Sequence, residues 1–400
     1  MKLKAQLLKL HFYNVFLSFR FTDAVWVVFL LSRGFTLAQV GIAEGVFHVT
    51  SFLCEIPTGI AADLLGRKRT LAVSGLCGVL SALFMAGSTG FAGVCLSMSF
   101  GAMMCNFASG TQEAITYDSL LMVGRQEDYL RVSAWMNGLS STSGAIGCLL
   151  GGAAALLGFF RAYLVDAFRC AAVAVFALSL TEPAVTEAQK KRIGNPFAEW
   201  GPRLREHIRI SAAFLKEHPR TACKILADAG AAVPIYLSLM YLQRHLVDNG
   251  LPSAWLGAAL LVVRIAGAAG AAAGAKLKLR LFSAAMLCAL CVGVGTILAG
   301  IEGRWLLSVL GAALASLADG AFGLRVEADL NGDFPSDRRA TLFSVDSMAY
   351  SLLMIAASPA SAAVGDALGT GWALRLLGAA LVVCAPGLGL LYRRVKRAVR

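Results

Sequence analysis

The stretch LFSAAMLCALCVGVGTILAG, residues 281–300, is an unbroken apolar run without a single charged side chain. A helix rises about 1.5 Å per residue, so roughly 20 apolar residues span the bilayer's hydrocarbon core of about 30 Å. Similar runs recur along the chain, and 58% of its 400 residues are hydrophobic while only 15% are charged. Soluble domains carry roughly 25% charged residues. The sequence therefore predicts an all-α protein that crosses a membrane repeatedly.

We predict twelve spans joined by short loops. Their approximate bounds are 11–31, 38–62, 70–88, 92–121, 130–157, 160–181, 221–243, 252–275, 281–300, 304–330, 339–363 and 371–392. Segments such as 67–69 and 276–280 are rich in Lys and Arg, and they alternate with segments that hold few basic residues. Basic loops mark the cytoplasmic side, so we expect both termini in the cytoplasm and the protein in the cell membrane, the inner one in a Gram-negative cell. The start MKLKAQLLKL has no small-residue cleavage site, so no removable signal peptide is expected.

The longest polar stretch, residues 182–220, divides the predicted spans into six and six. This division predicts an N-terminal six-helix bundle at 1–181, a cytoplasmic linker at 182–220 and a C-terminal six-helix bundle at 221–400. Within the linker, apolar residues such as Ile208 recur at roughly helical spacing among arginines, which suits a helix lying in the membrane interface. A solvated basic linker explains the same composition equally well.

Several other kinds of chemistry are not expected. The net charge of +12 comes from basic residues that lie between apolar runs, not on one face of a soluble domain, so nucleic acid is not a predicted partner. Cys288 and Cys291 form a CxxC inside an apolar run with no partner histidine, which disfavours a metal or redox site. No phosphate-binding loop, HExxH or GxSxG is present, so no cofactor and no enzyme activity are predicted.

The segment EIPTGIAADLLGRKRT, residues 55–70, joins the second predicted span to the third. It contains Gly59, Asp63, Gly66, Arg67 and Lys68 in the order GxxxDxxGRK. The glycines let backbones approach and turn tightly, Asp63 can lie at the positive N-terminus of a neighbouring helix, and Arg67 can pair with an acid. This spacing predicts a charged latch that holds in one conformational state and opens in another. A basic loop that only fixes topology explains the arginine and lysine but not the glycine and aspartate spacing.

This segment resembles the signature loop of the major facilitator superfamily, although Leu64 stands where the family has a basic residue. Together with EIPTG, the segments SGTQEAITYDSL (109–120) and NGDFPSDRRATLFS (331–344) resemble a bacterial subgroup of drug or metabolite exporters. The resemblance implies two pseudo-symmetric six-helix bundles that rock about a central solute cavity. It also implies that Asp118 joins the signature-loop charges. The corresponding loop of the second half, GAKLKLR, lacks the aspartate, so the latch is expected on one side only.

The fifth predicted span contains SGAIGCLLGG, with Ser143, Gly147, Gly151 and Gly152 on small-residue spacing. It resembles the glycine-rich motif of antiporters in the family, although Cys148 stands where that motif has proline. Small residues at this spacing also pack ordinary membrane helices. The motif therefore leaves antiport and simple packing both open.

Ionisable side chains inside the spans are stronger signals, because each costs roughly 2.5 to 3.5 kcal/mol at mid-bilayer unless it is paired or faces water. The pairs Arg20 with Asp23 and Lys224 with Asp228 have spacings that let each meet on one helix face, so structural pairing and cavity function are both open. The candidate substrate and proton sites are Arg20, Asp23, Glu44, Glu113, Tyr117, Lys224, Asp228, Arg264, Asp319, Arg325 and Asp346.

Glu113 is the leading candidate for proton coupling. It lies within the fourth predicted span and has Tyr117, not a cation, one turn away. Burial in a low-dielectric medium penalises its ionised form, so it is expected to exchange protons as a cavity wets and dries. The alternative is a neutral carboxyl group that hydrogen-bonds Tyr117 or another helix.

These features predict a monomeric secondary transporter in the lipid bilayer. The leading hypothesis is proton-coupled efflux of drug-like or amphiphilic metabolites, with the small solute and protons as its partners. A proton-coupled importer of a small metabolite is the nearest alternative, because one fold supports both directions. An intramembrane enzyme or a sensor on a transporter-like shell is a third interpretation.

Overall fold

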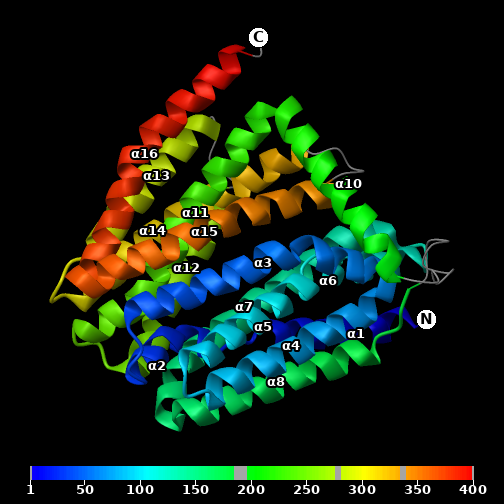
Figure 1. Cartoon of the computed structure of the whole chain (residues 1–400), viewed down its shortest axis with the longest axis horizontal. Helices are drawn as coiled ribbons and strands as arrows, with labels where there is room; N and C mark the ends of the chain where they lie inside the picture. Colours follow the sequence, from blue (N-terminus) through cyan, green and yellow to red (C-terminus); the bar gives the residue numbers. More distant parts are fainter. Residues whose placement is uncertain (1, 184–195, 275–280, 334–338, 399–400) are drawn as a thin grey trace. The chain divides into compact units, whose positions relative to one another are not determined.

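The computed structural model describes residues 2–183, 196–274, 281–333 and 339–398, and within these ranges it contains helices and no strands (Figure 1). The helices are α1 (Leu3–Ser18), α2 (Trp26–Ser32), α3 (Leu37–Leu65), α4 (Arg67–Gly87), α5 (Phe91–Ala108), α6 (Thr111–Leu121), α7 (Tyr129–Leu157), α8 (Phe159–Ser179), α10 (Pro196–Glu217), α11 (Pro219–Asp248), α12 (Leu256–Gly274), α13 (Leu281–Ala299), α14 (Trp305–Asp333), α15 (Arg339–Leu368) and α16 (Thr370–Ala398). Short 3₁₀ turns lie at Thr22–Ala24, Gln126–Asp128 and Ser253–Trp255.

The predicted membrane class is confirmed. Among the described residues, 7 helical segments are long and apolar enough to cross a bilayer, with α5 and α6 counted together as Phe91–Leu121, and the number rises to 8 if the bent pair around Ala24 is one span. Shorter apolar helices lie at Met286–Ala299, Trp305–Ala321 and Thr370–Pro386. The number twelve stays a prediction.

The helices group into two compact units. Unit 1 contains Met1–Asp23 and Val46–Arg209, and unit 2 contains Ala24–Gly45 and Ile210–Arg400. The helix α3 therefore starts in unit 2 and continues in unit 1. This division by contacts does not test the six-helix bundles expected at 1–181 and 221–400, which stay a prediction.

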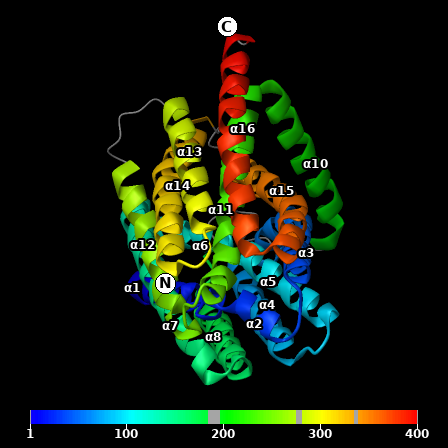
Figure 2. The same ribbon diagram turned by 90° about the vertical axis from the view of Figure 1, so that its left-hand side faces the viewer.

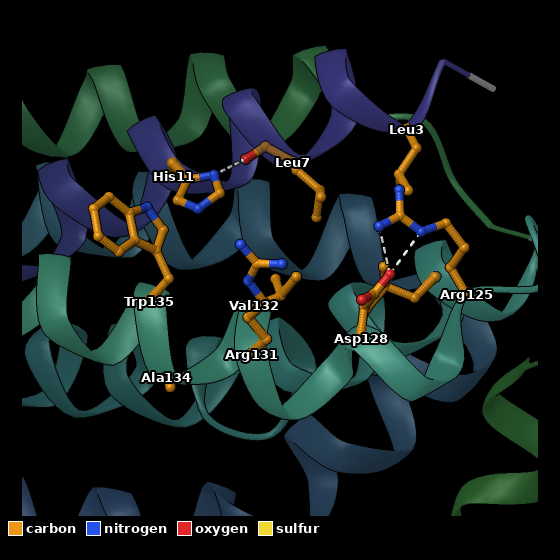
Figure 3. A pocket seen from close by; sticks show the side chains of 10 residues that line it. Leu3, Leu7, His11, Arg125, Asp128, Arg131, Val132, Ala134 and Trp135 are labelled. Carbon is orange, nitrogen blue, oxygen red and sulfur yellow. Dashed lines mark hydrogen bonds and ion pairs between the residues drawn. The ribbon is translucent and has the colours of Figure 1, made fainter.

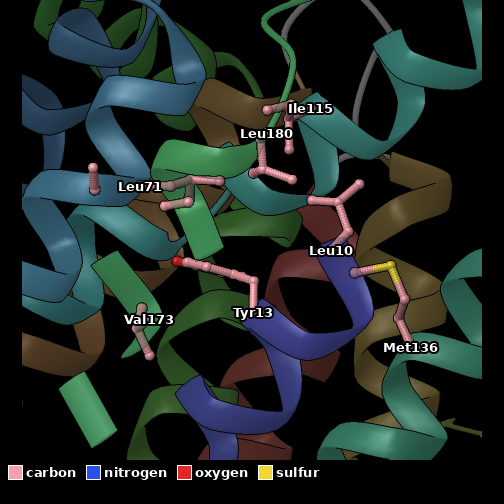
Figure 4. Close-up of a cluster of buried hydrophobic side chains, with 9 residues drawn as sticks. Leu10, Tyr13, Leu71, Ile115, Met136, Val173 and Leu180 are labelled. Atoms are coloured by element: carbon pink, nitrogen blue, oxygen red, sulfur yellow. The ribbon is translucent and has the colours of Figure 1, made fainter. Parts of the chain in front are cut away.

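Small and apolar side chains hold unit 1 together. Where α4 packs along α8, a Cβ at Gly75 would lie 2.5 Å from the backbone nitrogen of Ala174, so only glycine permits this approach. Leu10 of α1, Leu71 of α4 and Val173 of α8 belong to the buried cluster drawn in Figure 4. This cluster joins α1 to the helices around it.

Unit 2 uses the same kind of packing. The helix α14 packs against both α12 and α13, and α13 packs against α16 (Figure 2). A Cβ at Gly274 would lie 2.5 Å from the carbonyl oxygen of Ala321, and one at Gly295 would lie 2.6 Å from that of Gly311. Lipid supplies no hydrophobic force between helices, so close backbone contact of this kind stabilises the association.

The predicted linker contains a long helix. The helix α10 covers Pro196–Glu217, with Phe214 buried and Ile208 exposed. The helical spacing inferred from the sequence therefore corresponds to a helix, while its place in the membrane interface stays a prediction.

Candidate functional site

The first predicted span is broken. The helix α1 ends at Ser18, and the next helix begins at Trp26. Arg169 of α8 donates from Nη1 to the carbonyl oxygens of Phe16, at 2.7 Å, and Leu17, at 3.2 Å. The last carbonyls of a helix have no partner within it, so this guanidinium group stabilises the end of α1.

Arg169 itself is held by Asp166, one turn earlier on α8. Its Nε lies 2.7 Å from Oδ1 and its Nη2 lies 3.3 Å from Oδ2, and both residues are buried. A buried charge needs a close partner and further hydrogen bonds, and this pair has both. Sequence analysis missed these two residues, although their i, i+3 spacing inside the sixth predicted span was a usable signal.

Arg20 and Asp23 lie in the break and not on one face of a continuous helix, so the predicted i, i+3 helical pairing is wrong in its geometry. The Nη2 of Arg20 lies 3.4 Å from the Sγ of Cys105 on α5, and the charge of the exposed Asp23 acts on Arg20. Gly147 of the glycine-rich motif lies against the break, because a Cβ there would come within 3.1 Å of the Arg20 backbone nitrogen. The motif therefore lets α7 approach the end of α1.

The fourth predicted span is interrupted too, although α5 and α6 still form one span, Phe91–Leu121, without a sharp bend. The helix α5 ends at Ala108, Gly110 adopts a φ of +68°, and α6 begins at Thr111. Glu113 lies in the first turn of α6 and is exposed, so the predicted burial of its carboxyl group is wrong. The positive end of a helix favours a carboxylate at this position. The hydropathy of the whole run hid this short break.

Tyr117 does not form the hydrogen bond with Glu113 that was the first form of the alternative interpretation. Its ring lies edge-on against Tyr129, with ring centroids 5.4 Å apart, and it is 42% exposed. Within the described part of the chain, no hydrogen bond joins the two side chains of Glu113 and Tyr117.

The two breaks are connected. Gln112 of α6 donates to the Oδ1 of Asn14 on α1 at 3.0 Å, and Asn14 donates to the carbonyl oxygen of Met136 at 2.7 Å. Arg20 already contacts α5, the helix that leads into the second break. We call the group Asn14, Arg20, Asp23, Gln112 and Glu113 the break site. It presents hydrogen-bonding groups and both signs of charge in one part of unit 1.

The signature loop forms a second polar group. The backbone N–H groups of Arg67 and Lys68 each donate to the carboxylate of Glu182 at 2.8 Å, at the start of α4. The Arg67 guanidinium pairs with Asp118 on α6 and donates to the carbonyl oxygen of Ala114. Sequence analysis missed Glu182, which occupies a helix N-terminus in the manner expected for Asp63.

The remaining predicted residues of this loop are Gly66, Gly59 and Asp63. Gly66 has a φ of +95°, which glycine adopts without strain, so it makes the turn between α3 and α4. A Cβ at Gly59 would meet nothing within 4 Å among the described residues, so the close approach expected there stays a prediction. The side chain of Asp63 lies outside the described part.

Acidic candidates gather in unit 2. Glu44 is 1% exposed, and its charge and that of Asp319 both reach the hydroxyl group of Tyr350. Glu44 also acts on Tyr241, whose hydroxyl lies 2.7 Å from the Oγ of Ser361. Neither tyrosine was predicted, because both lie far along the sequence from Glu44 and no motif links them to it.

The remaining candidates are scattered. Lys224, Asp228 and Asp346 are partly buried and Arg264 is exposed, while the side chain of Arg325 lies outside the described part.

The start of α3 is held by α15 inside unit 2. The carboxylate of Asp366 accepts hydrogen bonds from the backbone nitrogens of Leu37, at 2.8 Å, and Ala38, at 2.7 Å. Ser358 donates to the carbonyl oxygen of Gly41 at 3.0 Å, and a Cβ at Gly41 would lie 2.7 Å from the Ser358 carbonyl oxygen. A carboxylate at a helix N-terminus satisfies otherwise unpaired N–H groups, so Asp366 fixes the first turn of α3.

The sequence and the fold were compared with those of known proteins. The chain is similar to the uncharacterized MFS-type transporter YxaM of Bacillus subtilis, at 27% identity over 89 residues, and the match spans 22% of that relative's length. Its structure is similar to the nucleoside transporter NupG, with a TM-score of 0.77, 16% identity and coverage of 98% of this chain and 99% of that chain. It is also similar to a D-xylose-proton symporter, with a TM-score of 0.71, 11% identity and 96% of each chain covered.

A third similar structure is the human organic anion transporter MFSD10, with a TM-score of 0.64, 17% identity and coverage of 97% of this chain and 100% of that chain. At such identities these likenesses establish the fold alone. The family model of the Major Facilitator Superfamily matches residues 12–324. This match covers more than half of the chain, so the chain belongs to the Major Facilitator Superfamily and is a membrane transporter, not an enzyme.

Proposed function

We propose that the chain is a proton-coupled secondary transporter that moves a small solute across the cell membrane by alternating access. The observation that carries this proposal is the meeting of two broken spans at the break site. Discontinuous helices place helix ends and polar side chains inside the membrane, and transporters use them to bind solutes and ions near the bilayer midplane. In the proposal the break site contributes the solute contacts of unit 1.

The contact between α3 and α15 supports a gate. Asp366 holds Leu37 and Ala38 with two hydrogen bonds, and Ser358 holds Gly41 with another. A few hydrogen bonds are enough to favour the closed state, because two conformations of a protein commonly differ by only a few kcal/mol. In the proposal this contact closes one side of the solute path, and the pair Arg67 with Asp118 acts as the latch of the signature loop.

Proton coupling is assigned to acids that reach open space or lie among tyrosines. Glu113 and Asp23 are exposed at the two breaks, and Glu44 lies near Tyr241 and Tyr350. An exposed acid beside a water-filled path can gain and lose a proton as the path opens to each side. Glu113 remains our first choice, now as an acid at a helix N-terminus and not as a buried one.

Two kinds of solute remain candidates. Efflux of drug-like or amphiphilic metabolites is favoured by the exporter-like segments of the sequence. Uptake of a polar metabolite is favoured by the amide and charged groups of the break site, which suit a solute rich in hydroxyl groups. Two structural neighbours are described as a nucleoside transporter and a D-xylose-proton symporter, which supports the second candidate.

The remaining parts of the proposal follow the sequence. Twelve spans form two six-helix bundles, both termini face the cytoplasm, and the protein acts as a monomer. The basic loops support this orientation through the positive-inside rule.

The test is a solute panel in proteoliposomes with an imposed pH difference. Labelled nucleosides and pentoses represent polar solutes, and fluorescent amphiphilic cations represent drug-like ones. Uptake of one class that depends on both the protein and the pH gradient identifies the solute, and reversing the gradient identifies the direction. Two results would contradict the proposal: chemical conversion of a solute by the protein, or uptake of every solute at the same rate as in protein-free vesicles.

A further inference from the structure

A pocket of about 760 Å³ opens between α1 and the start of α7 (Figure 3). Leu3, Leu7 and His11 line it from α1, and Arg131 and Trp135 line it from α7. The volume falls in the usual range for small-molecule sites, roughly 300 to 1,000 Å³. The proposed transport mechanism does not use this pocket.

The polar groups of the pocket are not all satisfied. Arg125 is paired with Asp128, with Nη2 and Oδ2 2.5 Å apart, so these two charges offset each other. Arg131 makes no hydrogen bond or ion pair with any residue that the structure describes. The Nδ1 of His11 contacts the Leu7 carbonyl oxygen, and its buried Nε2 has no hydrogen-bond partner in the same set of residues. The guanidinium group of Arg131 is thus available to a ligand.

We propose that this pocket binds the phosphate-bearing headgroup of an anionic phospholipid. The planar guanidinium group of Arg131 can donate two parallel hydrogen bonds to a phosphate. Basic pockets between membrane helices on the cytoplasmic side suit anionic headgroups. Figure 3 shows Arg131 extending from α7 toward α1, with Trp135 and His11 beside it.

The depth of the pocket matches a lipid better than a soluble anion. Leu3 and His11 are eight residues apart, so the lining of α1 extends over about 12 Å along the helix. The polar interface on each side of a bilayer is roughly 5 to 8 Å thick, so the pocket reaches from headgroup level to the start of the acyl chains. On the topology predicted from the basic loops, this end of α1 faces the cytoplasm.

The surface around the pocket is apolar. Leu8 is 58% exposed on α1, and Leu130 and Trp135 are 80% and 63% exposed on α7. An exposed tryptophan beside basic residues is typical of the headgroup level, where its ring contacts chains and its N–H contacts polar groups. A soluble phosphate would use the arginine but not these side chains. The combination of cation, aromatic ring and exposed leucines therefore favours a lipid.

The test is native mass spectrometry of the purified full chain with phosphatidylglycerol, supported by a binding titration. The parent protein is expected to retain one phosphatidylglycerol more tightly than phosphatidylethanolamine. Arg131→Gln removes the charge with little change in length and is expected to weaken this binding about tenfold. Arg161→Gln, an exposed arginine that lines no part of the pocket, is the matched control and should bind as the parent does.

Two further arms separate the possible outcomes. Trp135→Ala should weaken lipid retention several-fold while leaving Arg131 in place, so it replaces Arg131→Gln if that variant does not fold. Inorganic phosphate should not displace the lipid at millimolar concentration. Equal retention by the parent and both pocket variants would overturn the proposal, and displacement by phosphate alone would assign the pocket to a soluble anion. The measurement needs no transport, so its result is independent of the solute and coupling proposed above.

Discussion

At the scale of single residues, the charges of unit 1 have two kinds of surroundings. Arg169 and Glu182 are bound to helix ends and complete their hydrogen bonding. Asp23 and Glu113 are exposed at the breaks in the first and fourth spans. A charge that completes a helix end is expected to affect folding when removed, whereas an exposed acid is expected to affect coupling. The two groups can be separated by measurement.

Glu113→Gln tests the coupling role. Glutamine keeps the shape and hydrogen bonding of the protonated acid but cannot release a proton, so solute binding and solute-for-solute exchange should persist. Accumulation driven by a pH gradient should fall to the level of protein-free vesicles. Glu127→Gln, an exposed acid in the turn before α7, is the control and should accumulate solute normally. If Glu113→Gln concentrates solute as well as the parent does, Asp23 becomes the better candidate.

Arg169→Met tests the stabilising role. It leaves Asp166 buried without its partner and removes the donors at the end of α1, a loss of about 3 to 5 kcal/mol for a broken buried pair. Thermal unfolding in detergent should show a clearly lower Tm. The control is Arg244→Gln, which breaks the pair with Asp248 where both side chains are 42% exposed, and an exposed pair contributes only about 0 to 1 kcal/mol. Equal shifts in the two variants would contradict this account.

At the scale of elements, α3 has an unusual position because its first turns belong to unit 2 and the remainder to unit 1. Asp366 binds the first turn, and Ser358 binds the second through the Gly41 carbonyl oxygen. Asp366 and Ser358 both lie on α15, and the backbone of α15 packs closely against Gly41. The start of α3 is therefore the part of the helix whose release would open the proposed gate.

Asp366→Asn tests this gate. The amide removes the negative charge from the helix N-terminus, where a charge contributes about 0.3 to 1 kcal/mol, so release should become up to about fivefold more frequent. Ala362→Cys, at a buried position of α15 beside Gly41, provides a reporter for a membrane-impermeant maleimide in a background without the native cysteines. Its labelling should accelerate in the Asp366→Asn variant and not in Asp248→Asn. An unchanged labelling rate would show that the contact does not limit opening.

At the scale of the whole molecule, the sequence predicted what depends on local composition. Hydropathy indicated the membrane helices, and the GxxxDxxGRK spacing pointed to the family. The break in the fourth span was not predicted, because a hydropathy window averages over Gly110 and treats residues 92–121 as one helix. This averaging is also why Glu113 was expected to be buried.

Contacts between distant parts of the chain account for the other omissions. Asp366 and Leu37 are 329 positions apart, and Arg169 meets Phe16 across 153 positions. No periodicity or motif links such pairs, since they depend on how the helices pack. Glu182 was missed for a similar reason, because it lies in the polar stretch that was read only as a linker.

The central claim is that this member of the Major Facilitator Superfamily uses a proton gradient to move a solute. The most direct measurement takes the solute identified by the panel and follows its accumulation in proteoliposomes under an imposed pH difference, with and without a protonophore. The account predicts accumulation above equilibrium that collapses when the protonophore dissipates the gradient, and an accompanying proton flux. Equilibration of the solute to equal concentrations, with no response to the gradient or the protonophore, would contradict it.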